Sequence, residues 1–192
     1  METLDLDLQK RYSYADYLSW MDDKRRELID GFIKLMTPAP ARKHQKISGN
    51  LFREISLYLK NKKCQVYSAP FDVRLPKDSM QPDKIYNVVQ PDISVICDPK
   101  KLDDRGCIGA PDLIIEIISP ATSKRDVHEK YLLYEKSGVL EYWIVYPHEK
   151  TVSVFKLKEK KYHLDAMYAG NDEILPGIFN DLVIKLEEIF ED

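Results

Sequence analysis

A short apolar run that contains one acidic residue is the feature that most constrains this chain. Residues 113–118 read Leu-Ile-Ile-Glu-Ile-Ile, a composition that predicts a strand buried in a sheet. The preceding Pro111-Asp112 pair is typical of a turn. A carboxylate within an apolar strand is costly unless it is neutralised, paired or bound to a metal ion. Glu116 therefore needs a partner that its neighbours in the sequence do not supply.

A second apolar strand begins with the same Pro-Asp pair. It covers residues 91–96, Pro-Asp-Ile-Ser-Val-Ile, and its aspartate is Asp92. The 24 residues between Asp92 and Glu116 (116 − 92) allow a strand, a loop and a return along a neighbouring strand. Two carboxylates side by side in a low-dielectric site share a proton or bind a divalent cation. The pair predicts a magnesium (or manganese) site, with a simple turn role for Asp92 as the alternative.

A lysine on the next helix is the predicted third member of the site. Residues 124–136 predict a helix that ends at Gly138 and has Tyr134 in its apolar stripe. Lys130 lies at the edge of that stripe, from which it can reach back toward Glu116. A lysine there would orient water or stabilise negative charge during hydrolysis. Alternatively, Lys130 extends along the helix edge into solvent.

The rest of the pattern predicts a mixed sheet flanked by helices. Its expected elements, taken by type, are helices at 14–24, 44–59, 124–136 (with Ser123 and Asp126 as a capping box) and 186–190, strands at 64–75, 88–97, 113–118 and 140–146, hairpins at 25–36 (turning at Asp30-Gly31) and 151–168 (turning at Glu159-Lys160), and loops at 76–87 and 98–110.

Composition describes an ordinary globular chain of one domain, residues 1–192. The 192 residues suffice for one well-packed core, with 44% hydrophobic and 32% charged residues. No apolar run approaches the roughly 20 residues of a membrane span, and no signal peptide is visible, so a cytoplasmic protein with no membrane partner is expected. Cys64, Cys97 and Cys107 are odd in number and lack CxxC spacing, which predicts three plain thiols.

The net charge of −3 gives no global signal of nucleic-acid binding. Local basic clusters are the candidates for phosphate contacts. Arg42, Lys43 and Lys46 form one cluster, and Lys124 begins another. Clusters of this length usually lie on solvated faces, so folding must gather several of them before a phosphate-binding role follows.

Several segments together resemble a known family. PDIS at 91–94 and the region 111–146, with IIEIISPATSKRDVHEKYLLYEKSGVLEYWIVYP, resemble the Uma-two endonucleases of the PD-(D/E)xK restriction-endonuclease-like group. ELIDG at 27–31 and HQKISGNL at 44–51 extend the resemblance to about residues 12–190. The resemblance implies a mixed α/β restriction-endonuclease-like fold, with a central mixed β-sheet flanked by helices.

The resemblance also implies roles for individual residues. Asp92 and Glu116 would bind magnesium, and Ile118 stands where the lysine of the group's ExK element would be. In families of this type the following helix can supply that lysine, which again indicates Lys130. Glu27 and His44 match upstream segments that approach the site as accessory residues. On the sequence alone, Glu27 can equally be a hairpin surface residue and His44 a residue of the helix start.

Two functions from different classes follow. The first is a metal-dependent endonuclease that hydrolyses phosphodiester bonds, with DNA as the expected substrate and a homodimer as a suitable assembly for cutting both strands. The second is a catalytically inactive protein of the same fold that binds nucleic acid or a protein partner. A hydrolase with a Ser or Cys nucleophile has no Gly-x-Ser-x-Gly or Cys-centred motif to support it.

Overall fold

The computed structural model describes residues 4–36, 41–119 and 124–191, with the side chains of 124–126 left out. Its helices and strands in chain order are α1 (Tyr14–Leu18), β1 (Arg26–Ile29), β2 (Phe32–Leu35), α2 (Arg42–Leu59), β3 (Gln65–Ser68), β4 (Asp72–Arg74), β5 (Val88–Val89), β6 (Ile93–Ile96), β7 (Leu102–Asp103), β8 (Gly106–Ile108), β9 (Leu113–Ile117), α3 (Lys124–Ser137), β10 (Glu141–Tyr146), β11 (Thr151–Lys158), β12 (Lys161–Ala169), β13 (Glu173–Ile174), β14 (Ile184–Lys185) and α4 (Leu186–Ile189). Short 3₁₀ turns occupy Pro82–Lys84 and Pro99–Lys101.

Two six-stranded sheets form the framework. The central sheet has the order β12-β11-β10-β9-β6-β3, in which β9 and β10 are parallel and the other neighbours antiparallel. The second sheet has the order β2-β1-β5-β4-β8-β7, and β13 pairs with β14 separately. The expected mixed sheet flanked by helices is confirmed, although the second sheet was not foreseen.

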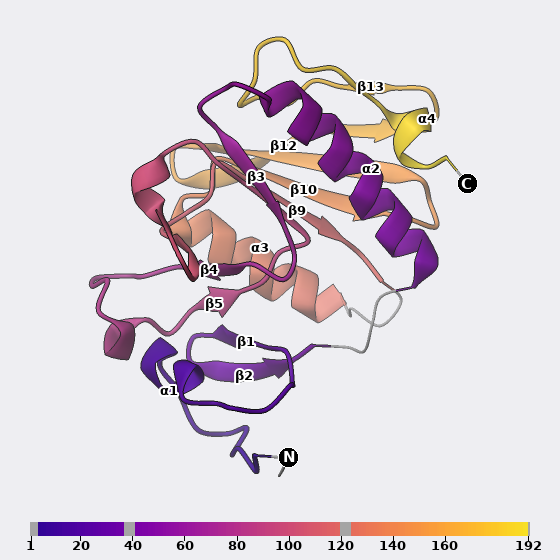
Figure 1. Ribbon diagram of the computed structural model, residues 1–192. Coiled ribbons are helices and arrows are strands. Elements are labelled where there is room, and N and C mark those ends of the chain that lie inside the picture. The colour runs from indigo at the N-terminus through magenta and orange to yellow at the C-terminus, as the bar shows by residue number, and fades with distance from the viewer. Residues whose placement is uncertain (1–3, 37–40, 120–123, 192) are drawn as a thin grey trace.

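Helices cover both faces of the central sheet (Figure 1). Alternate residues of β9 point to opposite faces, so Leu113, Ile115 and Ile117 join one core cluster and Ile114 joins another. The first cluster contains the apolar stripe of α2, and the second contains side chains of α3. Glu116 has the parity of Ile114 and therefore faces α3.

Two segments expected to be single strands each pass from one sheet to the other. Residues 64–75 divide into β3 and β4 around the cis Ala69-Pro70 bond, and 88–97 divide into β5 and β6 around Pro91. Proline has no N–H for a sheet ladder, which gives a physical reason for each break. The two crossing points are adjacent, because Ala69 N–H donates to the Asp92 carbonyl oxygen at 3.0 Å.

Other expectations differ in detail. The helix expected at 14–24 ends at Leu18, and the loop expected at 98–110 contains β7 and β8. Gly106 permits this pairing, since a Cβ there would collide with the carbonyl oxygen of Asp72 in β4. Both hairpin turns are confirmed, with positive φ at Asp30-Gly31 and at Glu159-Lys160. The capping box expected at the start of α3 lies outside the described residues.

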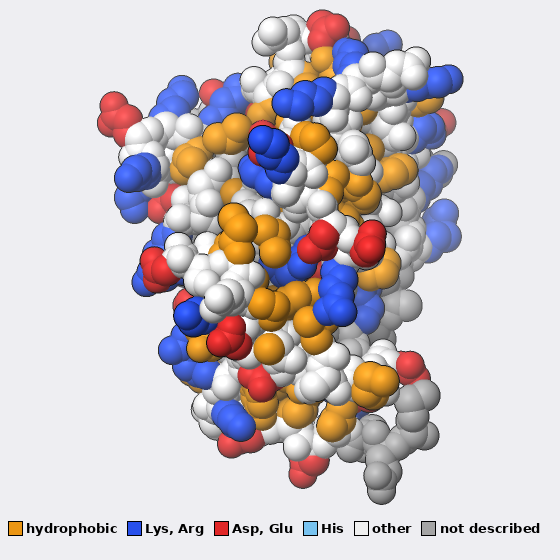
Figure 2. All heavy atoms as spheres, turned by 60° about the vertical axis from the view of Figure 1, so that its left-hand side comes forward, with side chains coloured by type: hydrophobic (Ala, Val, Ile, Leu, Met, Phe, Trp, Pro, Cys, Tyr) orange, Lys and Arg blue, Asp and Glu red, His pale blue; other side chains and the backbone are white. Residues whose placement is uncertain are grey.

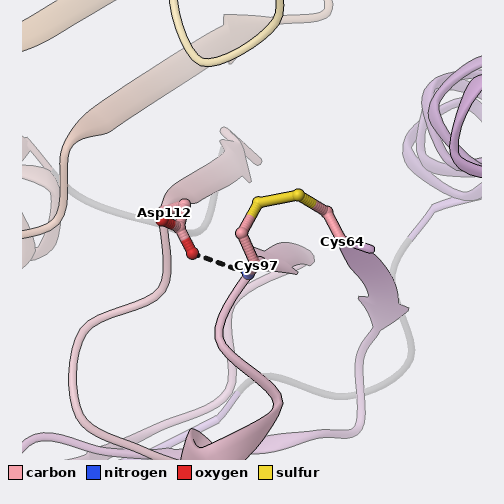
Figure 3. Close-up of a disulfide and its surroundings, with 3 residues drawn as sticks. All are labelled: Cys64, Cys97 and Asp112. Atoms are coloured by element: carbon pink, nitrogen blue, oxygen red, sulfur yellow. Dashed lines mark hydrogen bonds between the residues drawn. A yellow bond between two sulfur atoms is a disulfide. The ribbon is translucent and has the colours of Figure 1, made fainter. Parts of the chain in front are cut away.

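The prediction of three plain thiols is wrong. Cys64 and Cys97 form a disulfide (Figure 3), whereas Cys107 is free and buried. The antiparallel register of β3 and β6 pairs Gln65 with Ile96, and one step further it brings the two cysteines opposite each other. No local pattern indicates that register, because it depends on where β3 ends at the Pro70 break.

The second core cluster joins the two large sheets. It contains Val73 and Val89 from the second sheet together with Ile114 and Tyr142 from the central sheet. We propose on this ground that the described chain forms one domain. In the part of the chain that the structure describes, no helix is long and apolar enough to cross a membrane. The cytoplasmic location stays a prediction.

Candidate active site

Strands β6 and β9 bring the two predicted metal ligands together. Their ladder pairs Ile93 with Ile115, and the next position places Asp92 opposite Glu116. Asp92 is held in place because its Oδ2 accepts the Ile117 N–H at 2.8 Å. Both carboxylates line one cavity, which lies close to the points where the chain crosses between the sheets.

Among the described residues, the Glu116 side chain has two hydrogen-bond partners, both on α3. Lys130 Nζ donates to its Oε1 at 2.9 Å, and the Tyr134 hydroxyl donates to the same oxygen at 2.7 Å. Lys130 and Tyr134 are one helical turn apart, so both reach the same strand residue. Burial raises the pKa of Glu116 to about 7, with Asp92 and Glu27 adding to the rise and Lys130 opposing it. Glu116 therefore holds a proton more readily than an exposed glutamate does.

Lys130 links Glu116 to a third carboxylate. Its Nζ also donates to Glu27 Oε1 at 2.9 Å, and that oxygen accepts the Gln90 N–H at 2.8 Å. Glu27 is only 5% exposed, so the alternative of a surface hairpin residue is wrong. Burial alone would lower the pKa of Lys130, but the Glu116 and Glu27 carboxylates outweigh it and raise that pKa. The ammonium group therefore stays charged and cannot accept a proton from water.

His44 contacts the other predicted ligand. It lies in the first turn of α2, and its Nε2 is 3.3 Å from Asp92 Oδ2. Burial alone would lower the pKa of His44, but the hydrogen bond and charge interaction with Asp92 outweigh it and raise that pKa. Its Nδ1 is buried without a hydrogen-bond partner among the described residues. An unpartnered polar atom in a cavity is a place where a water or ligand would bind.

The cavity itself has a volume of about 620 Å³. The β1–β2 hairpin forms one side of it and α2 the other, and the strand ends with α3 complete it. Among the described residues, its lining carries four carboxylates and three cations; these are Glu27, Asp92, Glu116 and Glu129, and Arg25, Lys34 and Lys130. The charged lining thus has a small negative excess before His44 is counted.

Comparison with known proteins places this arrangement in a family. A sequence profile described as "Uma2: Putative restriction endonuclease" matches residues 14–187. The chain belongs to the Uma2 family. The resemblance found from the sequence is therefore confirmed, and the family description supports a nuclease function.

One solved structure and one further sequence are similar to this Uma2 chain. A solved structure from Anabaena variabilis, described as a putative nuclease belonging to DUF820, superposes with a TM-score of 0.73 and 22% identity. That match covers 93% of this chain and 97% of the other, and it shows that the two share a fold. An uncharacterized protein of Synechocystis is 26% identical over 137 residues, which cover 70% of this chain and 68% of that protein.

The Uma2 structure gathers some of the residues considered in the sequence and leaves others apart. It brings Asp92, Glu116, Lys130, Glu27 and His44 into the cavity. Arg42, Lys43 and Lys46 lie on α2 but do not line the cavity, and the side chain of Lys124 lies outside the described part. On the face shown in Figure 2, basic and acidic side chains are interspersed among hydrophobic ones, without a continuous basic surface.

Sequence reasoning missed two polar contributors. Tyr134 was assigned to the apolar stripe of its helix, yet its hydroxyl holds Glu116. Gln90 precedes the Pro91 crossing, and it binds Glu27 through its backbone and Arg25 through its side chain. The sequence signal for this role of Tyr134 was its spacing of four residues from Lys130, which places both side chains on the same side of the helix. Asp112 does not line the cavity, and its side chain ties two distant segments together, because its Oδ2 accepts the Cys97 N–H at 2.7 Å (Figure 3).

The carboxylate oxygens of the site suit a hard divalent cation that is bound by few protein ligands. Asp92 Oδ1 and Glu116 Oε2 accept no hydrogen bond from the described residues, so each carboxylate keeps one oxygen for a ligand. No group of three or more His, Cys, Asp and Glu side chains suited to a metal occurs within 4–36, 41–119 and 124–191. Magnesium needs no such group, because it keeps several waters and binds through one or two carboxylates.

Proposed function

We propose that this protein is a metal-dependent endonuclease that hydrolyses phosphodiester bonds in DNA. Asp92 and Glu116 would hold magnesium or manganese, and Lys130 would be the fixed positive charge of the site. The observation that carries the proposal is the contact of Lys130 Nζ with Glu116 Oε1, directly across from Asp92 on the neighbouring strand. Membership of the Uma2 family supports the reaction class.

Each residue of the site has a separate role in this proposal. Bound magnesium would lower the pKa of a water molecule and polarise a phosphoryl oxygen. His44 and the Ile117 N–H hold one oxygen of Asp92, which orients the other oxygen. Tyr134 and Lys130 do the same for Glu116. Lys130 stays protonated, so its role is to stabilise developing negative charge on the phosphate.

The balance of charge favours a cation-dependent reaction. Lys130 is shared by Glu116 and Glu27, and Lys34 pairs with Glu129 at 2.6 Å. The Asp92 and Glu116 carboxylates would repel a phosphate that approaches them directly. A divalent ion between Asp92 and Glu116 would remove that repulsion and bind the phosphate directly.

The deciding experiment is isothermal titration with magnesium and manganese. Asp92→Asn and Glu116→Gln should each abolish metal uptake, while both variants fold. Asp112→Asn is the matched control, since it makes the same charge change at the other end of the β9 segment and lies outside the cavity. Purified protein should then be tested with single-stranded, double-stranded and branched DNA and RNA. Unchanged metal affinity in both cavity variants would end the proposed site.

A second candidate is a protein of the same fold that binds nucleic acid or a protein partner without hydrolysis. It is favoured by the pairing of Lys130 with Glu116 and Glu27, which neutralises buried carboxylates without any metal ion. This candidate predicts no carboxylate-dependent metal uptake in the same titration. A homodimer would bring two sites to the two strands of a duplex, and light scattering of the purified protein tests that assembly.

A further inference from the structure

The cavity has an apolar wall that metal binding does not require. Besides its charged residues, it is lined by Leu8, Ile29, Ile33, Leu35, Met36 and Phe52. Leu35 on the hairpin is 60% exposed, and Phe52 on α2 is partly buried. Apolar side chains exposed next to carboxylates contribute nothing to binding a phosphate or a metal ion. They fit a ligand that has an apolar face close to its anionic group.

An exposed glycine lies in the α2 side of the cavity lining. Gly49 lies in the middle of α2, where glycine destabilises a helix relative to alanine. A Cβ at this position would meet no atom within 4 Å, so close packing does not explain the glycine. Gly49 lines the cavity one helical turn before Phe52. The open space beside it is room for a ligand.

A cation without an acidic partner lies in the same lining. Arg25 donates from Nε and Nη2 to the Gln90 side-chain oxygen, at 3.0 and 2.8 Å, and that acceptor is neutral. Within the described residues, no carboxylate forms an ion pair with Arg25, in contrast to Lys34 and Lys130. The fixed guanidinium therefore keeps both its charge and further N–H donors for an anion such as a phosphate.

We infer that the cavity holds one unstacked nucleotide, so that the substrate of the proposed nuclease is single-stranded nucleic acid. This inference rests on the proposed function for the phosphate at Asp92 and Glu116. The base would pack between the Leu35 and Phe52 sides, and Arg25 would bind a neighbouring phosphate. In a duplex the faces of each base are covered by stacking, so the apolar wall would have no base to contact. The volume of about 620 Å³ lies within the roughly 300–1,000 Å³ of small-ligand sites.

The test is fluorescence anisotropy in magnesium with one labelled, non-hydrolysable oligonucleotide, alone and annealed to its complement. The wild type should bind the single strand at least about tenfold more tightly than the duplex. Leu35→Ser should weaken single-strand binding by about tenfold. Leu57→Ser is the matched control, because Leu57 is 65% exposed on α2 outside this cavity, and it should bind as the wild type does.

Gly49→Leu adds a large side chain to the cavity lining at a position where no packed neighbour has to move. Leucine favours a helix, so the melting temperature should be equal or higher, while single-strand binding should fall by about tenfold or more. Gly49→Ala should give an intermediate loss. Magnesium binding, measured by titration calorimetry, should be the same in Gly49→Leu and wild type. Equal binding of duplex and single strand by the wild type, or full single-strand affinity in Gly49→Leu, would overturn the inference.

The same measurements separate this inference from the proposed function. If the wild type binds metal and cuts duplex as fast as single strands, the nuclease stands and the nucleotide pocket is wrong. If single strands bind in the cavity but no metal binds and nothing is cut, the pocket stands and the metal-dependent reaction is wrong.

Discussion

Lys130 of α3 and Glu116 of β9 form a direct contact, with Nζ 2.9 Å from Oε1. The lysine thus comes from the helix that follows the strand rather than from position 118 of the strand itself. Ile118 has the same parity as Glu116 and packs against the second core cluster. A lysine placed one helix later can reach two carboxylates at once, because Glu27 on the hairpin lies at the same distance from Nζ.

Replacing Lys130 by alanine should show what its charge contributes to stability and to turnover. Removing one member of a buried ion pair costs about 3–5 kcal/mol, so metal-free Lys130→Ala should melt at a lower temperature than wild type. Magnesium should restore part of this loss, since its charge replaces the ammonium. Turnover should fall by about 100-fold or more on any substrate that the wild type cleaves. Lys136→Ala, on the exposed side of α3, should change neither quantity. Wild-type turnover in Lys130→Ala would show that the lysine has no part in the reaction.

The raised pKa of Glu116 predicts how stability depends on pH. The folded pKa is about 7 against an ordinary 4.5. Between these values the folded protein holds a proton that the unfolded chain has released, so metal-free stability should fall as pH rises from about 4.5 to about 7. His44, with its own raised pKa, acts in the same direction. The readout is therefore the difference between wild type and Glu116→Gln in melting temperature, measured in EDTA at several pH values. Parallel curves for the two proteins would contradict the assigned pKa.

The core of the site was predictable because local patterns encode it. The apolar run around Glu116 identified a buried carboxylate, and the spacing to Asp92 allowed two adjacent strands. The position of Lys130 at the edge of the helix stripe followed from helical periodicity. Each of these inferences needs only a few neighbouring residues and one pairing of strands.

The remaining parts of the site depend on contacts that no local pattern records. Glu27 looks like a hairpin surface residue until Gln90 and Lys130 cover it from segments far along the chain. The second sheet forms because two extended segments are interrupted at Pro70 and Pro91. A proline in the sequence predicts such an interruption, but it does not predict which sheet the following strand joins. The pairing of Cys64 with Cys97 depends on those same breaks.

The basic residues at the start of α2 give a prediction about salt. Arg42, Lys43 and Lys46 lie outside the cavity, where they can contact only flanking phosphates. Changing all three to alanine should weaken single-strand binding and reduce the slope of log affinity against log salt by about 2, at about 0.7 per phosphate contact. The matched control changes three exposed lysines of the central sheet, which are Lys158 at the end of β11 and Lys150 and Lys160 in the turns before and after that strand. Equal losses in both triple variants would indicate non-specific attraction rather than a defined path for the strand.

The disulfide predicts a stability effect that leaves the cavity intact. It joins Cys64, before β3, to Cys97, after β6, across 33 residues. A link over such a loop restricts the unfolded chain and contributes about 3–4 kcal/mol. Cys64→Ser/Cys97→Ser should therefore lower the free energy of unfolding in urea by about that amount, and a reductant should lower it only in the wild type. Metal affinity should be unchanged, because Asp92 at the opposite end of β6 is held by Ile117 and His44. Three reactive thiols in unfolded, unreduced wild type, instead of the single Cys107, would show that the bond does not form.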